Sequence, residues 1–249
     1  MRTIRIWGRH AVFSALSNKQ RQVESIICIK KYAEEVKQIR RVSIKIVDRR
    51  HLDDILPGVQ HQGILLMCSS LNTCKLSTCD HINPDDNILA LDQLQDPQNI
   101  GAIMRSMAAF NFKHLLVTKD RCPELDGVAA KASCGGIDRV HILKAVNLAD
   151  SLIRLKKNGF WCFGLEGNEK DEYKKYSGNI TKGVVLVVGS EGFGIRDRIK
   201  SECDGFISID TNPEFPVLNA SVAASLGMHI INNGDKYVPK KLEKDTSCL

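Results

Sequence analysis

An arginine in an otherwise apolar helical segment is the first candidate for chemistry. Asp96-Pro97 closes a polar loop, and the spacing that follows predicts a helix over residues 100–109. Arg105 lies in this helix close to Gly101, a small residue that lets another backbone or a substrate approach. A guanidinium in such a segment must face solvent or a partner, because burial of an unpaired charge is costly. Contact with a substrate and a solvated position are the two alternatives.

A glycine-rich loop with one carboxylate is the second candidate. The segment Gly189-Ser190-Glu191-Gly192-Phe193-Gly194 directly follows the most apolar stretch of the chain. Its glycines leave backbone groups open to a ligand, but the pattern is not G-x-G-x-x-G, and Glu191 would repel a pyrophosphate. The loop therefore argues against a dinucleotide or phosphate site, and a plain glycine turn is the alternative.

The third candidate is a polar residue at the start of an alanine-rich helix. Residues 207–209 end an apolar stretch, an irregular loop follows, and Asn219 comes where a helix over 220–232 should begin. The small residues of this helix allow very close packing against another element. Simple capping by Asn219 and ordinary helix packing are the alternatives.

These three segments must be positioned by a larger α/β framework. Five apolar stretches predict buried strands, at 88–91, 114–117, 161–164, 184–188 and 205–209. Helical patterns lie at 100–109, 127–133, 148–157, 195–202 and 220–232. Strands that alternate with helices predict a parallel sheet covered on both faces, where ligands collect at the strand ends.

A smaller α/β module precedes this framework. Helical patterns end near Ser17 and span 32–41 and 52–56, and strand patterns span 23–29, 44–47 and 61–67. We expect a first domain over 1–70, a linker over 71–86, a second domain over 87–234 and a flexible tail over 235–249.

The basic residues are concentrated in the first domain. Residues 1–70 hold 13 Lys and Arg against 6 Asp and Glu, and the remaining chain holds 22 against 23, which gives the net charge of +6. This asymmetry favours a module that contacts a polyanion such as nucleic acid, although part of the charge could simply aid solubility.

Composition excludes several other classes. The 9 cysteines form no C-x-x-C pair, so we expect no metal site and read them as reduced thiols, with a catalytic cysteine as the lesser alternative. No apolar run approaches the ~20 residues of a membrane span, and the N-terminus lacks a signal-peptide pattern. We therefore expect a cytoplasmic protein with no membrane association.

Taken together, the three segments resemble the motifs of the SpoU branch of SPOUT RNA methyltransferases. The motifs are N-x-G-x-x-x-R from Asn99 to Arg105, G-x-E-G-x-G from Gly189 to Gly194, and L-N-x-S-V-A from Leu218 to Ala223. The similarity covers about residues 4–232. Further stretches resemble 23S rRNA guanosine 2′-O-methyltransferases of the RlmB type. They are Trp7-Gly8-x-His10-Ala11-Val12, His61-Gln62-Gly63, Lys119-Asp120-Arg121 and Ala132-Ser133-Cys134-Gly135-Gly136.

The resemblance implies a fold, a cofactor and an assembly. The second domain should be a SPOUT fold with a deep trefoil knot, an exception to unknotted connections. S-adenosylmethionine should bind in the knot, held by backbone groups that match Gly189, Ile209 and Leu218. The protein should be a homodimer through this domain, with each site completed across the interface.

The same resemblance implies roles for side chains. The reaction would transfer a methyl group to a ribose 2′-hydroxyl, with a guanosine of ribosomal RNA as the expected target. Arg105 matches the arginine that activates this hydroxyl. Because arginine is normally protonated, we expect it to stabilise the developing alkoxide. Asn99, Glu191 and Asn219 match positions that order the site. The first domain would contact RNA, with Arg9, His10 and His61 as candidates; structural packing is the alternative for His10.

The sequence departs from the family pattern at two places in the third motif. Asp210-Thr211 replaces the usual Pro-Met, and Val217 replaces the usual Ser before Leu-Asn. Three functions therefore stay open: rRNA methylation, methylation of a tRNA ribose, and RNA binding or ribosome assembly without transfer. A nicotinamide dehydrogenase is disfavoured because the glycine fingerprint is missing.

Overall fold

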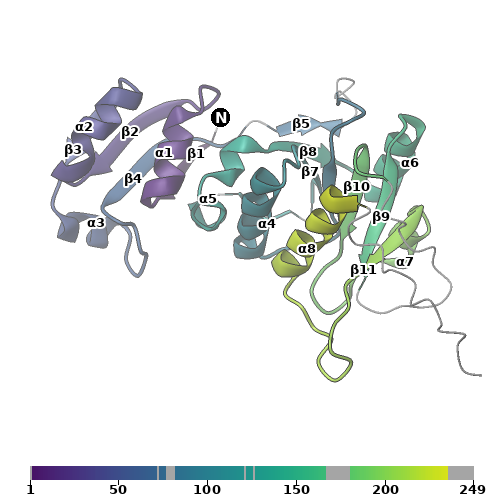
Figure 1. Cartoon of the computed structure of the whole chain (residues 1–249). Helices are drawn as coiled ribbons and strands as arrows, with labels where there is room; N and C mark the ends of the chain where they lie inside the picture. Colours follow the sequence, from purple (N-terminus) through teal and green to yellow (C-terminus); the bar gives the residue numbers. More distant parts are fainter. Residues whose placement is uncertain are drawn as a thin grey trace, which may run out of the picture.

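The computed structural model (Figure 1) describes residues 2–71, 73–76, 82–120, 122–125, 127–166 and 180–234. The predicted tail 235–249 lies outside the described residues, as do Cys79, Arg121 and Cys248. The described chain forms two sheets, each packed against helices. Within these ranges, none of the helices has the length and apolar character that a membrane crossing requires.

The N-terminal sheet has four strands in the order β1-β4-β2-β3. Its strands are β1 (Thr3–Trp7), β2 (Val23–Cys28), β3 (Ser43–Ile46) and β4 (Ile64–Ser69), and its helices are α1 (Arg9–Ser17), α2 (Lys30–Ile39) and α3 (Arg49–Ile55). Side chains alternate across the sheet, because Leu66 packs with the cluster that contains α1 and α2, whereas Leu65 packs with Leu52 of α3. The predicted module is therefore an α/β layer structure, with an additional first strand that was not predicted.

The second sheet has seven parallel strands in the order β11-β9-β10-β6-β7-β8-β5. These are β5 (Thr73–Lys75), β6 (Ile88–Leu91), β7 (His114–Thr118), β8 (His141–Ala145), β9 (Trp161–Glu166), β10 (Val184–Val188) and β11 (Gly205–Ser208). The helices are α4 (Pro97–Ala109), α5 (Gly127–Ser133), η2 (Gly136–Arg139, a 3-10 turn), α6 (Leu148–Lys157), α7 (Asp197–Lys200) and α8 (Ala220–Asn233). The predicted α/β fold with a parallel sheet is confirmed.

Helices cover both faces of the parallel sheet. Along β10, Val184, Leu186 and Val188 pack with α4, α5 and α8, whereas Val185 and Val187 pack with α6 and α7. Both sides of this strand are therefore apolar, which explains why the sequence shows an unbroken run rather than an alternating one. Figure 1 shows α5 between the N-terminal elements and α4.

The predicted linker contains regular structure. Residues 73–75 form β5, which pairs in parallel with β8 at the edge of the seven-stranded sheet. All three residues are exposed, so they carry no apolar pattern that could predict a strand. Backbone hydrogen bonds to β8 alone define this element, and such pairing depends on tertiary contact.

Candidate active site

A cavity lies where the loops after β10 and β11 meet the start of α8. Its volume is about 410 Å³. The predicted cofactor residues Gly189, Ile209 and Leu218 all line it. Its other lining residues include Leu165, Glu166, Val188, Glu191, Thr211, Val217 and Ala223. Segments about 30 residues apart in the sequence thus form one site, at the carboxyl ends of parallel strands.

The glycine loop is folded tightly against itself. Ser190 and Gly194 exchange two backbone hydrogen bonds of 3.2 and 3.0 Å. A Cβ atom on Gly189 would lie only 2.1 Å from the carbonyl carbon of Gly194, so no larger residue fits there without moving the loop. This packing places the loop at the cavity wall, which Glu191 and Phe193 also line.

Three of the predicted site residues form a hydrogen-bonded cluster beside the cavity. The Nδ2 of Asn99 donates to the Oε1 of Glu191 at 2.7 Å. The Nδ2 of Asn219 donates to the Oδ1 of Asn99 at 3.0 Å and to the same Glu191 oxygen at 3.2 Å. Asn219 also caps α8, because its Oδ1 accepts a bond from the backbone N–H of Ser221. All three motifs therefore contribute one side chain to a single polar cluster.

An ion pair that the sequence did not predict, between a buried carboxylate and a half-exposed arginine, holds two of the site loops together. Asp92 follows β6 and is fully buried. Its carboxylate accepts bonds from the backbone N–H of Arg196 at 3.0 Å and from the Nη2 of Arg196 at 2.6 Å. Because Arg196 ends the glycine loop, this pair fixes that loop against the end of β6. The only sequence signal was an Asp directly after a buried strand.

Arg105 lies apart from the other predicted catalytic residues. It is on α4, six residues after Asn99, and therefore about 9 Å further along the helix and on a different side of it. Its side chain is exposed and does not line the cavity. Gly136 of η2 packs against its backbone, since a Cβ atom there would lie 2.8 Å from the Cα of Arg105. Within the described chain, Arg105 therefore does not reach the cavity beside which the other predicted catalytic residues lie.

The predicted RNA-contacting residues differ in exposure. Arg9 and His10 lie exposed at the start of α1, where Arg9 pairs with Glu35 at 2.8 Å and stacks over Phe13. The prediction that His61 contacts RNA is corrected, because this residue is only 1% exposed.

Both ring nitrogens of His61 have partners inside the first domain. Its Nδ1 accepts the backbone N–H of Gly63 at 3.0 Å, and its Nε2 contacts Asp53 at 2.8 Å. This residue therefore stabilises a turn and offers no free edge to RNA.

The buried and half-buried cysteines have thiols of low reactivity. Burial raises the pKa of the thiols of Cys28, Cys68 and Cys122, and it raises the pKa of Cys203 to about 12. A thiol with a raised pKa is protonated at neutral pH and is a poor nucleophile. Among the described residues, no three His, Cys, Asp or Glu side chains gather as a metal site would require.

Comparison with known proteins identifies the family. The SpoU rRNA Methylase family profile matches residues 86–229, and the RNA 2′-O ribose methyltransferase substrate binding profile matches residues 5–74. This chain belongs to the SpoU methylase family. SpoU methyltransferases use S-adenosylmethionine, and the predictions of family, activity class and cofactor are confirmed at that level.

Two curated members of the SpoU family match over most of the chain. YacO of Bacillus subtilis, which its name places among TrmH family tRNA/rRNA methyltransferases, is 30% identical and covers 89% of this chain and 92% of its own. The 23S rRNA (guanosine-2′-O-)-methyltransferase RlmB of Pasteurella multocida is 31% identical, and the match covers 89% of this chain and 94% of the length of RlmB. The chain is therefore an RNA methyltransferase, and its RNA substrate is the open question.

A solved SpoU structure has the same fold. The SpoU methyltransferase AviRb of Streptomyces viridochromogenes, crystallised with AdoMet, matches with a TM-score of 0.76 at 16% identity, over 92% of this chain and 89% of its own. At this coverage, the likeness in fold extends over both sheets. The trefoil knot implied by the sequence resemblance stays a prediction.

Proposed function

We propose that this protein transfers a methyl group from S-adenosylmethionine to the 2′-hydroxyl of a guanosine ribose in 23S ribosomal RNA. The observation that carries the proposal is the cavity formed by the second and third motifs, beside which Asn99 of the first motif is bonded to Glu191 and Asn219. The 31% identity to a guanosine 2′-O-methyltransferase of 23S rRNA supports the choice of nucleotide and RNA. Residues 1–70 would bind the RNA and residues 87–234 would carry the chemistry.

The cavity has the character that a nucleoside cofactor requires. Gly189, Ile209 and Leu218 line the cavity, where their backbone groups would hydrogen-bond an adenine, and Leu165 and Val188 would supply apolar surface for its ring. The absence of a side chain on Gly189 lets the backbone of Gly194 pack against it and so fixes the shape of this wall. When bound, S-adenosylmethionine supplies an electrophilic methyl group, and the protein contributes its orientation.

Arg105 would stabilise the negative charge that develops on the ribose oxygen. A protonated guanidinium is suited to this role, and its exposed position leaves it free to meet RNA. Asn99, Glu191 and Asn219 would order the loops and the substrate around the transferred methyl group.

A homodimer would bring Arg105 and the cavity together. Helix α8 exposes Val222 (47%) and Leu226 (39%), and the loop before it exposes Val217 (71%). Adjacent exposed apolar side chains are typical of a protein–protein interface. We infer that two copies pair through this surface, so that the partner subunit's Arg105 completes each cavity.

The replacement of the motif serine by Val217 favours a second candidate. Val217 lines the cavity and carries no hydroxyl for substrate or arginine, which would suit an RNA-binding or ribosome-assembly factor that no longer transfers methyl groups. Methylation of a tRNA ribose is the other alternative, since YacO is named for both RNA classes. In each case the protein would act in the cytoplasm.

Transfer of tritium from labelled S-adenosylmethionine separates these functions. The substrates are unmodified 23S rRNA and unmodified tRNA, and the methylated site is then mapped by resistance of the 2′-O-methylated bond to alkali. Label on a guanosine ribose of 23S rRNA is the expected result. Label only on tRNA would assign the alternative substrate, and cofactor binding without label on either RNA would favour the assembly factor.

A further inference from the structure

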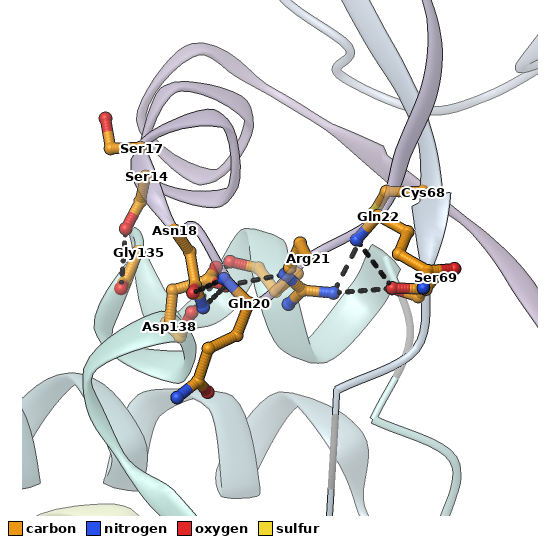
Figure 2. Close-up of polar contacts among 12 residues, drawn as sticks. Ser14, Ser17, Asn18, Gln20, Arg21, Gln22, Cys68, Ser69, Gly135 and Asp138 are labelled. Atoms are coloured by element: carbon orange, nitrogen blue, oxygen red, sulfur yellow. Dashed lines mark hydrogen bonds and ion pairs between the residues drawn. The ribbon is translucent and has the colours of Figure 1, made fainter. Parts of the chain in front are cut away.

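The two domains are joined by a buried ion pair that belongs to neither the cavity nor the family motifs (Figure 2). Arg21 comes from the turn between α1 and β2, and Asp138 comes from η2. The Nε of Arg21 lies 2.5 Å from the Oδ1 of Asp138, and the side chains are only 1% and 2% exposed. A fully buried arginine–carboxylate pair between separate domains needs an explanation, because taking two charges out of water is costly.

Other groups orient this pair on both sides. Asn18 donates from its Nδ2 to the same Oδ1 of Asp138 at 2.9 Å, and the Nη1 of Arg21 donates to the carbonyl oxygen of Ser69 at 3.1 Å. Next to it, the hydroxyl of Ser14 donates to the carbonyl oxygen of Gly135 at 3.0 Å. The dashed contacts in Figure 2 therefore link α1, the following turn and β4 to the segment around η2.

The apolar core is continuous across the same junction. One cluster of buried side chains includes Val12 and Leu66 of the first domain together with Ile100 and Ile137 of the second. Trp7 of β1 lies directly against Gly127 at the start of α5. The first domain is thus docked on α5 and η2 through packing as well as through the ion pair.

The segment that carries Asp138 also supports the helix of Arg105. A Cβ atom on Gly136 would lie 2.6 Å from the carbonyl oxygen of Met104 and 2.8 Å from the Cα of Arg105. Asp138 is two residues further along the chain. A continuous run of close contacts therefore leads from Arg21 through η2 to the backbone of Arg105.

We propose that Arg21 is a positioning residue for methyl transfer, because its ion pair with Asp138 fixes the RNA-binding domain on the η2 segment that supports Arg105. RNA held on the first domain is then presented to Arg105 in one orientation. This rests on the proposed function, in which the first domain binds the RNA and Arg105 acts on the ribose. A directional, buried ion pair suits this task, since it forms in only one relative placement of the two domains.

Hydrogen exchange tests the docking without any need for catalysis. In the full-length protein, Arg21→Gln removes the charge and leaves Asp138 buried without its cation. We expect amide exchange of residues 134–140 and 14–22 to accelerate about 100-fold, with little change in β10. The matched control is Arg2→Gln, which breaks an exposed interdomain pair between Arg2 and Glu124 and should change exchange little.

Kinetics test the positioning. With unmodified 23S rRNA, we expect Arg21→Gln to lower kcat about 10- to 100-fold, while the Kd values for RNA and for S-adenosylmethionine change less than about threefold. Arg21→Lys keeps the charge and should recover most of kcat. Adding Asp138→Asn to Arg21→Gln should cause little further loss, because the two residues act through one contact.

Specific outcomes would overturn the proposal. Unchanged exchange at 134–140 in Arg21→Gln would show that the pair does not hold the domains. Faster exchange with an unchanged kcat would show that fixed docking is not needed for transfer. A parallel loss of cofactor affinity, RNA affinity and kcat that Arg21→Lys does not restore would mean a general folding role. A wild-type protein that transfers no methyl group to any RNA would contradict the proposed function, whereas the exchange results would still decide on the junction.

Discussion

Two carboxylates in this protein are each held by hydrogen bonds between distant segments, but one is exposed to solvent and the other is buried. Glu191 is exposed and accepts its bonds from the neutral amides of Asn99 and Asn219. Asp138 is buried and accepts from Arg21 as well as from Asn18. The exposed cluster keeps polar groups within reach of a substrate, whereas the buried cluster uses its groups to join two domains.

Helix α4 connects these two regions. Its first turn carries Asn99 into the cluster at the cavity, and its backbone near Arg105 packs against Gly136 of the junction. A change at either end therefore has a route to the other through one rigid element. The largest expected effect of a substitution is therefore on this helix, at Arg105.

Arg105→Ala should lower methyl transfer about 10²- to 10³-fold, because the developing charge on the ribose oxygen loses its stabilising guanidinium. Affinity for S-adenosylmethionine should stay nearly constant, since Arg105 does not line the cavity of its own subunit and the partner subunit's Arg105 would face the ribose rather than the cofactor. Single-turnover transfer and equilibrium dialysis measure the two quantities. Equal losses in both would mean that Arg105 supports the fold rather than the reaction.

Asp138→Ala should lower the free energy of unfolding by about 3 kcal/mol or more, because Arg21 stays buried without a counter-charge. At the exposed cluster, Glu191→Gln should change stability by less than about 1 kcal/mol. Urea unfolding of both variants compares the two regions directly. Similar losses in the two variants would contradict the distinction between a buried and an exposed carboxylate.

Gly189→Ala should weaken binding of S-adenosylmethionine at least about tenfold, since the added Cβ collides with Gly194 and must displace the glycine loop. RNA affinity should be unaffected, because the change is confined to the cavity. Isothermal titration with the cofactor and filter binding with RNA provide the measurements. The control is Gly192→Ala: nothing lies within 4 Å of its added Cβ, and only its φ of 87° is strained.

Asn219→Ala should cost about 1 kcal/mol of stability through loss of the cap on α8. It also removes two of the three bonds of the exposed cluster, so the activity loss should exceed what this stability change explains. Asn219→Asp keeps the capping oxygen and places a second negative charge beside Glu191. Recovery of stability without recovery of activity in that variant would separate capping from site ordering.

The smallest expected effect concerns a third carboxylate, that of Asp86, and it is a dependence of stability on pH. Burial lowers the pKa of its partner His114 below 6.5, although the hydrogen bond to Asp86 opposes this shift. The folded chain then binds fewer protons than the unfolded chain, so stability should fall as the pH decreases from 7 through the lowered pKa. Thermal unfolding between pH 7 and 5 should show this slope, and His114→Gln should flatten it.

Much of the framework and of the cavity could be predicted from the sequence. The apolar run 184–188, the capping asparagine before α8 and the glycine loop are local signals, because strand burial, capping and loop shape depend on residues close in the chain. The motif order also placed Asn99, Glu191 and Asn219 in one site. In the structure, these side chains are bonded to one another.

Tertiary structure alone decided the contacts between distant polar residues. Arg21 and Asp138 are 117 residues apart, and Asp92 and Arg196 are 104 residues apart, so no local pattern marks either pair. The same reason explains β5, an exposed strand defined only by its pairing with β8, and His61, whose place in a motif gave no sign of burial. Local sequence determined which elements form and which residues are chemically able to act. The packing of the elements determined which charges are buried, because burial depends on neighbours that the chain brings from far away.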